Sequence, residues 1–453
     1  MNKLTIMAST LALTFSFSAA AKVSEAEAAK LGNELTPMGA ERAGNADGSI
    51  PEWTGGVTAP PAGYKEGDFH PMPFADDKPL FTITAANMAE YQQYLTPGVK
   101  AMFAQYPDTF KMNIYPTHRT ASYPQYIYDQ VKKNATSAEL AANGNGIIGA
   151  SAGSPFPIPQ NGLEAIWNHT LRYRGKTAQL QRNQATPTAA GDYTLVETEE
   201  SIIFSYGDTE IDPQQMAKDN NLFYFKQIVT APSRLAGTAL LVHETMDQEK
   251  DPRQAWTYNT GQRRVRRAPN VAFDAPGTAS DGLRTTDDFD LFNGSPQRYN
   301  WTLKGKKELY IPYNDYRLHS DNLSYDEILK PGHINMDLVR WEKHRVWEVE
   351  ANLKEGVRHT YKTRTYYLDE DSWQIALADL YDNRGELYRV GMLHSINYYE
   401  KPLMWSTLEA FYDLNSKRYI AMGLDNQGDV VNFNKPLRQR DFTPQALRRA
   451  GRR

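Results

Sequence analysis

The sequence predicts a mainly β protein with some helix, whose main body is a curled antiparallel sheet. Three observations support this fold class. From about residue 190, β-branched and aromatic residues alternate with polar ones in short runs, which is the period of β-strands. Asn and Gly residues separate pairs of these runs, as in hairpins. The chain also holds 27 Tyr, 17 Phe and 8 Trp, enough large side chains to fill or line such a sheet.

Individual stretches carry this pattern. The strand-like runs are "DYTLVETEESIIFSY", "NLFYFKQIVTAP", "GTALLVHETMD", "KELYIPYN", "KHRVWEVEANL" and "RHTYKTRTYYLDEDSW". The expected hairpins are "LYDNRGELYRV", "AFYDLNSKRYIAMG" and "LDNQGDVVNF". Many strands joined by short turns favour an antiparallel sheet that curls.

Residues 1–21 predict a cleaved secretory signal peptide. Lys3 precedes a short apolar run, and the small residues Ala19 to Ala21 offer a cleavage site. The chain has no cysteine, so no lipid-attachment site and no disulfide is expected. These features predict a soluble exported protein.

The rest of the chain divides into two expected parts. Residues 22–150 hold eleven prolines between Pro37 and Pro124, which predicts an irregular, partly helical segment packed on the main body. Residues 151–453 are expected to form the main domain. It ends in a basic tail, in which residues 436–453 carry six arginines and one acidic residue. This tail is either a solvated end or a weak attraction to anionic lipid head groups.

One helix is expected before the strands, in "NGLEAIWNHTLRYRG". Asn161 is placed to cap it, Glu164 follows three residues later, and Gly175 is placed to stop it. Trp167 lies on the apolar face of this helix. It either packs against the sheet or lines a ligand cavity.

No motif predicts catalysis convincingly. "GNGIIG" matches the glycine pattern of a dinucleotide-binding fingerprint, and "GASAG" matches the nucleophile elbow of serine hydrolases, with Ser151 in the position of the nucleophile. Both motifs require a helix directly afterwards, and the prolines of "SPFPIPQ" oppose one. "HETMD" lacks the second histidine of a zinc protease, and nine scattered histidines predict no metal site. A net charge of −4 lacks the excess of basic residues that is typical of nucleic-acid-binding proteins, so we expect no nucleic-acid partner. We expect no cofactor.

The stretch "AWTYNTGQRRVRRAPN" predicts a hairpin that turns at Asn259-Thr260-Gly261. Trp256 and Tyr258 would lie on one arm and Arg263, Arg264, Arg266 and Arg267 on the other. Because side chains alternate between faces, two arginines would point into any concave side. A buried guanidinium needs an anionic partner. The partners are either Asp287, Asp288 and Asp290, as structural ion pairs, or the phosphate or carboxylate of a cargo, or an acidic partner protein.

Several long blocks resemble a known family. "LTPMGAERAGNADGSIPEWTGG", "FPIPQNGLEAIWNHTLRYRG", "WTYNTGQRRVRRAPN", "DDFDLFNGSPQRYNWTLKGKKELYIPYN" and "HRVWEVEANLKEGVRHTYKTRTYYLDEDSW" are similar to domain of unknown function family 1329, proteobacterial periplasmic proteins often labelled outer membrane lipoprotein-sorting proteins. The central part also resembles the LolA/LolB superfamily. This likeness implies an incomplete β-barrel wrapped over helices, with an apolar cavity for acyl chains. It also implies association with a resistance-nodulation-division type exporter or an outer-membrane protein.

The sequence therefore predicts a non-enzymatic periplasmic carrier or chaperone of a lipid, lipoprotein or other hydrophobic ligand. The expected ligand-binding residues are Trp167, Trp256, Tyr258, the four arginines after the turn, and Trp347. Two alternatives remain at this stage: an envelope serine hydrolase that uses Ser151, and a non-catalytic scaffold that binds only protein.

Overall fold

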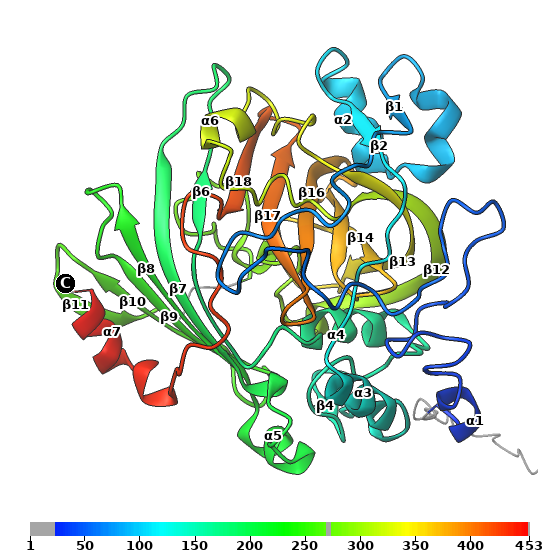
Figure 1. The fold of residues 1–453 in the computed structure, drawn as a ribbon. Helices are drawn as coiled ribbons and strands as arrows, with labels where there is room; N and C mark the ends of the chain where they lie inside the picture. The colour runs from blue at the N-terminus through cyan, green and yellow to red at the C-terminus, as the bar shows by residue number, and fades with distance from the viewer. Residues whose placement is uncertain (1–22, 269–272, 452–453) are drawn as a thin grey trace, which may run out of the picture.

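The computed structural model describes residues 23–268 and 273–451, so the expected signal peptide lies outside the described residues. Most strands join one large sheet that curls but does not close (Figure 1), and its pairs are antiparallel except for β2 with β13. This confirms the predicted fold class. Its strand order is β1-β2-β13-β14-β15-β16-β17-β18-β6-β7-β8-β9-β10-β11, with β12 paired to β13 and β5 to β7.

The sheet has two halves that differ in how they are covered. The closed half contains β12 (Tyr299–Pro312), β13 (Trp341–Leu353), β14 (Thr363–Asp369), β15 (Ile375–Tyr381), β16 (Leu387–Tyr398), β17 (Leu403–Asp413) and β18 (Arg418–Leu424). The open half contains β7 (Leu195–Phe204), β8 (Asn221–Ala231), β9 (Ala239–Thr245), β10 (Gln254–Asn259) and β11 (Arg264–Arg267). The short strands β5 (Thr177–Gln181) and β6 (Asn183–Ala185) lie where the two halves meet.

The closed half is buried on both faces. One apolar cluster joins one face to α3 (Gln125–Ser137) and α4 (Gly162–Leu171), and a second joins the opposite face to α2 (Pro97–Gln105). The remaining helices are α1 (Glu25–Ala28), α5 (Pro213–Asp219), α6 (Tyr325–Ile328) and α7 (Pro444–Ala450), with 3-10 turns η1 (Met88–Tyr94), η2 (Ser205–Gly207), η3 (Thr286–Asp288), η4 (Pro296–Arg298) and η5 (Gln439–Asp441).

Residues 23–150 are irregular for much of their length, but they also add to the sheet. β1 (Phe81–Ile83) pairs with β2 (Met112–Ile114), and Ile114 bridges to Trp341 of β13. A separate small hairpin, β3 (Glu139–Leu140) with β4 (Ile147–Ile148), contains the "GNGIIG" stretch. That stretch therefore forms a turn and does not lead into a helix.

The helix α4 begins as the sequence predicts. Asn161 caps it by accepting a hydrogen bond from the backbone N–H of Glu164. It ends at Leu171, four residues before Gly175. The predicted stop was wrong because Arg172 already leaves the helical conformation, and its guanidinium donates to the carbonyl of His169 at 2.6 Å.

Eight of the nine predicted strand and hairpin stretches supply strands of the sheet. The exception is "LDNQGDVVNF", where β18 ends at Leu424 and no hairpin follows. The predicted hairpin was wrong because tertiary contacts hold its turn residues. Asp425 accepts hydrogen bonds from Thr407 and His319, both at 2.8 Å, and Asn426 donates to the carbonyl of Leu323. The chain therefore leaves the sheet.

The C-terminal tail folds back onto the protein. It forms α7, which packs on the face of β9 and β10 that is turned away from the closed half (Figure 1). Phe442 and Leu447 are completely buried there with Leu241 and Tyr258. The described part of the tail is therefore a structural cover, although Arg448 and Arg449 remain exposed.

Candidate functional site: an amphipathic cavity in the open half

A cavity lies between the inner face of the open half and residues 273–298, here called the crossing segment. Its larger part has a volume of about 270 Å³, and a narrow extension beside Asp290 adds about 30 Å³. The two parts share Arg182, Phe223, Phe225 and Phe289 in their linings, so they are neighbours. The crossing segment contacts both halves of the sheet. Asp290 is bonded to Glu409 of β17 in the closed half, and the ring of Phe289 lies 6.1 Å from that of Phe225 of β8 in the open half, centre to centre.

The apolar part of the lining follows from strand periodicity. On β8, Phe223 and Phe225 point into the cavity, whereas Tyr224 between them packs under α7. β9 repeats the pattern, with Leu240 and Val242 lining the cavity. The other apolar residues of the lining are Ile202, Phe204, Ala275, Pro276, Phe289, Phe292, Met404, Trp405 and Met422.

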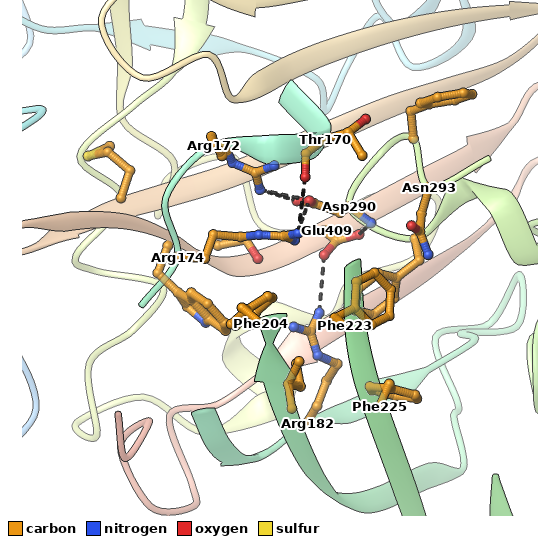
Figure 2. A pocket seen from close by; sticks show the side chains of 16 residues that line it. Thr170, Arg172, Arg174, Arg182, Phe204, Phe223, Phe225, Asp290, Asn293 and Glu409 are labelled. Carbon is orange, nitrogen blue, oxygen red and sulfur yellow. Dashed lines mark hydrogen bonds and ion pairs between the residues drawn. The ribbon is translucent and has the colours of Figure 1, made fainter. Parts of the chain in front are cut away.

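Buried charges close the narrow end (Figure 2). One nitrogen of Arg172 donates to both carboxylate oxygens of Asp290 at 2.7 Å, and Arg174 donates to one of them at 2.9 Å. Burial by itself would raise the pKa of Asp290, but the two guanidinium groups hold it below its usual value. Burial, and next to it the charge of Arg172, lowers the pKa of nearby His169 to about 3, so this ring is neutral.

A second set of charges continues along the cavity wall. Arg182 lies 3.1 Å from a carboxylate oxygen of Glu409 and 3.1 Å from one of Glu200. Glu409 also accepts a hydrogen bond from the backbone N–H of Asp290 at 2.9 Å, which joins the two sets. Burial raises the pKa of Glu409.

The backbone at this junction is strained. Asp290 and Leu291 both have a φ of +59°, a left-handed conformation that non-glycine residues rarely adopt. Such outliers persist only where surrounding contacts enforce them, and they cluster at functional sites. Here the contacts are the bonds of Asp290 and the complete burial of Leu291.

Arginine is in excess in the lining. The two parts of the cavity are lined by Arg172, Arg174, Arg182, Arg253 and Arg284 against Glu200, Glu244, Asp290 and Glu409. Arg253 donates to Glu244 and to the carbonyl of Asn293, both at 2.6 Å. The cavity therefore combines an aromatic wall with a positively biased set of buried charges.

The predicted hairpin is present, but its aromatic residues do not line the cavity. Trp256 pairs with Arg267 and Tyr258 with Val265 across β10 and β11. The alternation places Thr257 in the cavity lining, whereas Trp256 and Tyr258 pack on the opposite face with α7. The sequence established that Trp256 and Tyr258 share a face, but not which face is concave.

The predicted ion pairs involve the right aspartates and the wrong arginines. Arg263, Arg264, Arg266 and Arg267 are all exposed on the sheet edge. No ion pair joins them to a carboxylate within the described residues. Asp287 pairs with Arg364 at 2.8 Å and with His359 at 3.2 Å, and Arg364 is 3.9 Å from Asp288. Asp290 pairs with Arg172 and Arg174. The expectation was wrong because the crossing segment turns inward, away from β11.

The two other tryptophans proposed as ligand contacts lie in packed surroundings. Trp167 is 1% exposed, packs with Tyr206 and Leu222, and donates its ring N–H to the carbonyl of Gly144 at 3.3 Å. Trp347 stacks on Trp373, with ring centres 6.2 Å apart. Neither is part of the cavity lining described above.

Ser151 lies in a buried loop that no helix follows until α4. Its backbone is held by Asn134, which donates to the carbonyl of Ser151 at 3.1 Å. No hydrogen bond joins Ser151 to a histidine in the part of the chain that the structure describes. The strand–turn–helix geometry of a nucleophile elbow is thus not formed.

Three potential metal ligands, His344, Asp369 and Asp371, lie close together, with one ligand atom of each within 4.8 Å of the others. Arg119 donates to both oxygens of Asp371, at 2.8 and 2.7 Å. The guanidinium already supplies a cation to Asp371. This cluster is therefore an ion-pair network of the interior.

Sequence reasoning missed Arg284, Phe289 and Asn293 as lining residues. For Phe289 and Asn293 the available signal was the mixture of apolar and acidic residues in "TTDDFDLFN", which lacks strand alternation, whereas no local pattern marked Arg284. Phe223 and Phe225 were visible as alternating aromatics in "NLFYFKQIV".

Comparisons with known proteins identify relatives. The family model described as "Protein of unknown function (DUF1329)" matches residues 82–448. The uncharacterized protein PA3922 of Pseudomonas aeruginosa is 53% identical over 432 residues, which cover 95% of this chain and 94% of that protein.

Two solved structures are similar at lower identity. A domain named for outer membrane lipoprotein sorting, from Vibrio parahaemolyticus, is 14% identical with a TM-score of 0.44, over 63% of this chain and 98% of the other. A DUF1329 family protein from Desulfovibrio piger is 13% identical with a TM-score of 0.42, over 60% and 92%.

Among residues 23–268 and 273–451, no helix has the length and apolar character needed to cross a bilayer.

Proposed function

The chain belongs to the DUF1329 family, and on that premise we propose that it is a carrier that shields a lipid or another hydrophobic ligand inside the amphipathic cavity. The observation that carries the proposal is the cavity itself. Its lining combines the aromatic residues Phe223, Phe225 and Phe289 with fixed charges. Small-molecule sites typically combine a mostly apolar lining with a few placed polar groups, and occupy about 300–1,000 Å³.

Binding in this cavity requires burial and no reaction. Each methylene group transferred from water is worth about 0.8 kcal/mol, so one acyl chain supplies most of the affinity. Ser151 lies in a buried loop without a histidine partner among the described residues, and this observation favours a carrier over a serine hydrolase. We therefore propose a non-enzymatic role.

We place this carrier in the periplasm, because residues 1–21 have the features of a cleaved signal peptide. A carrier between two membranes needs a donor and an acceptor. An exporter of the resistance-nodulation-division type and an outer-membrane protein are the partners that we propose. The exposed arginines of β11, on the edge of the sheet, suit contact with an acidic surface of such a partner.

Native mass spectrometry of the protein purified from its own periplasm tests this function. We expect a bound lipid-sized mass that organic extraction removes. The variant Val242→Trp fills the cavity and should lose that mass. Thr230→Trp is the matched control on the same half of the sheet, because Thr230 is exposed and lies outside the cavity. Wild-type protein that is empty and labels at Ser151 with a serine-reactive phosphonate would overturn the proposal in favour of a hydrolase.

A further inference from the structure

Arg284 differs from every other arginine of the cavity lining. Arg172, Arg174, Arg182 and Arg253 each have a carboxylate oxygen within 3.1 Å. Arg284 is only 9% exposed and has no carboxylate oxygen within 4.0 Å in the described part of the chain. Among the described residues its guanidinium makes one hydrogen bond, from Nη1 to the carbonyl of Thr285 at 3.2 Å, and its Nε makes none.

The surroundings of Arg284 hold the guanidinium in place without neutralising it. The group packs flat against Gly277, where an added Cβ would lie 2.5 Å from its Cζ. Burial lowers the pKa of Arg284, although the more distant charges of Asp288, Glu409 and Glu200 oppose this effect. A buried cation without a paired anion is costly in free energy. A site that keeps one is prepared for an anion that arrives from outside.

The same cavity supplies an apolar region beside this cation. Phe225, Phe289, Leu240 and Val242 line it together with Arg284. Its volume of about 270 Å³ lies just below the usual range for small-ligand sites, which suits one hydrocarbon chain better than two. The lining thus offers one cation without a paired carboxylate, Arg284, next to an apolar region, while its other charged residues are already paired.

We propose that the cavity binds a single-chain amphiphile with an oxyanion head, whose carboxylate or phosphate pairs with Arg284 while its chain lies against the aromatic wall. This inference rests on the proposed carrier function and narrows its ligand class. Arginine is suited to the role because its planar fork donates two parallel hydrogen bonds to either oxyanion.

Calorimetric titration of delipidated full-length protein with three C16 probes tests the proposal. Palmitate and hexadecyl phosphate carry the two oxyanions, and hexadecanol has the same chain without charge. We expect the wild type to bind at least one anion about ten- to a hundredfold more tightly than the alcohol, as charge-assisted hydrogen bonds imply. Preference for palmitate or for the phosphate then identifies the head group.

Arg284→Gln should abolish this preference and leave hexadecanol binding unchanged. Arg284→Lys should keep part of it, because a lysine retains the charge but not the fork. Gly277→Ala should also weaken anion binding, because the added Cβ displaces the guanidinium. Arg264→Gln is the matched control, since it removes an exposed arginine outside the cavity.

Thermal melting separates a ligand-binding role from a structural one. Without ligand, Arg284→Gln should melt at the same temperature as the wild type or higher, because it removes an unpaired buried charge. A clear loss of stability would make Arg284 a structural residue and overturn the inference. Equal binding of all three probes would also overturn it but leave the carrier function standing, whereas binding of none would overturn both.

Discussion

The two halves of the sheet use the same kinds of residues to opposite effect. In the closed half, every residue of β16 from Arg389 to Tyr398 is buried, because apolar clusters cover both faces. In the open half, only Leu222 and Val229 of β8 are buried, since one face borders the cavity and the other lies partly under α7. The closed half supplies most of the packing, and the open half leaves space for a ligand.

Charges follow the same division. In the closed half, Arg364 is fully buried against Asp287 and neighbouring aromatic rings, where it ties the crossing segment to β14. In the crossing segment, beside the cavity of the open half, Arg284 is buried without such a partner. The crossing segment forms one wall of the cavity, and the ion pairs of Asp287 and Asp290 hold this wall in position, so that the cavity stays open. Four predictions test this comparison.

The largest expected effect comes from breaking a tie of the crossing segment. Arg364→Gln leaves Asp287 buried with only His359 as a nearby base, so we expect a loss of about 3–5 kcal/mol in the free energy of unfolding. Urea denaturation followed by circular dichroism measures it. A loss below about 1 kcal/mol would mean that this pair does not hold the segment.

Matched truncations of phenylalanine compare packing in the two halves directly. Phe411→Ala in β17 empties a site that is fully buried, and should cost about 3–5 kcal/mol. Phe225→Ala in β8 should cost less than about 2 kcal/mol, because one side of this ring already faces space. Equal losses in urea unfolding would show that the cavity is as tightly packed as the closed half.

The closed half should also make stability depend on pH. Burial raises the pKa of Asp379 to about 7, even though Tyr367 and Gly98 donate hydrogen bonds to it. The folded state therefore binds this proton more tightly than the unfolded state does. Its contribution to stability is complete below about pH 4 and falls as the pH rises through about 7, by about 1.4 kcal/mol per unit of pKa shift.

Asp379→Asn mimics the protonated carboxyl group and isolates this effect. Urea unfolding at pH 5 and pH 8 should show the variant to be more stable than the wild type at pH 8, with a smaller difference at pH 5. A pH-independent difference between the two proteins would contradict the assignment.

The smallest effect is expected at the exposed edge of the open half. The double variant Arg264→Gln, Arg266→Gln should change the free energy of unfolding by no more than about 0.5 kcal/mol, because both side chains are solvated. Its lipid loading should match the wild type in native mass spectrometry. If the double variant lost its bound lipid but unfolded like the wild type, the two arginines would instead bind the head group of the ligand.

Much of the local structure follows from local patterns. Strand alternation located β7, β8, β9 and β13, because the side-chain period of two is a property of each strand by itself. The cap at Asn161 and the turn after Asn259 were equally local, since their hydrogen bonds join residues only a few positions apart. The aromatic excess pointed to a concavity, but a filled core would have the same composition.

The sequence by itself determined that Phe223 shares a face with Phe225 and that Trp256 shares one with Tyr258. Only the tertiary structure decided that the first pair lines the cavity and the second lies under α7, because the direction in which a sheet curls depends on what packs against it. The arginines show the same limit. The four around Val265 and the single Arg284 differ little as sequence, yet the former are exposed and the latter is buried. A guanidinium's environment is set by residues far away in the chain, and no local period reports it.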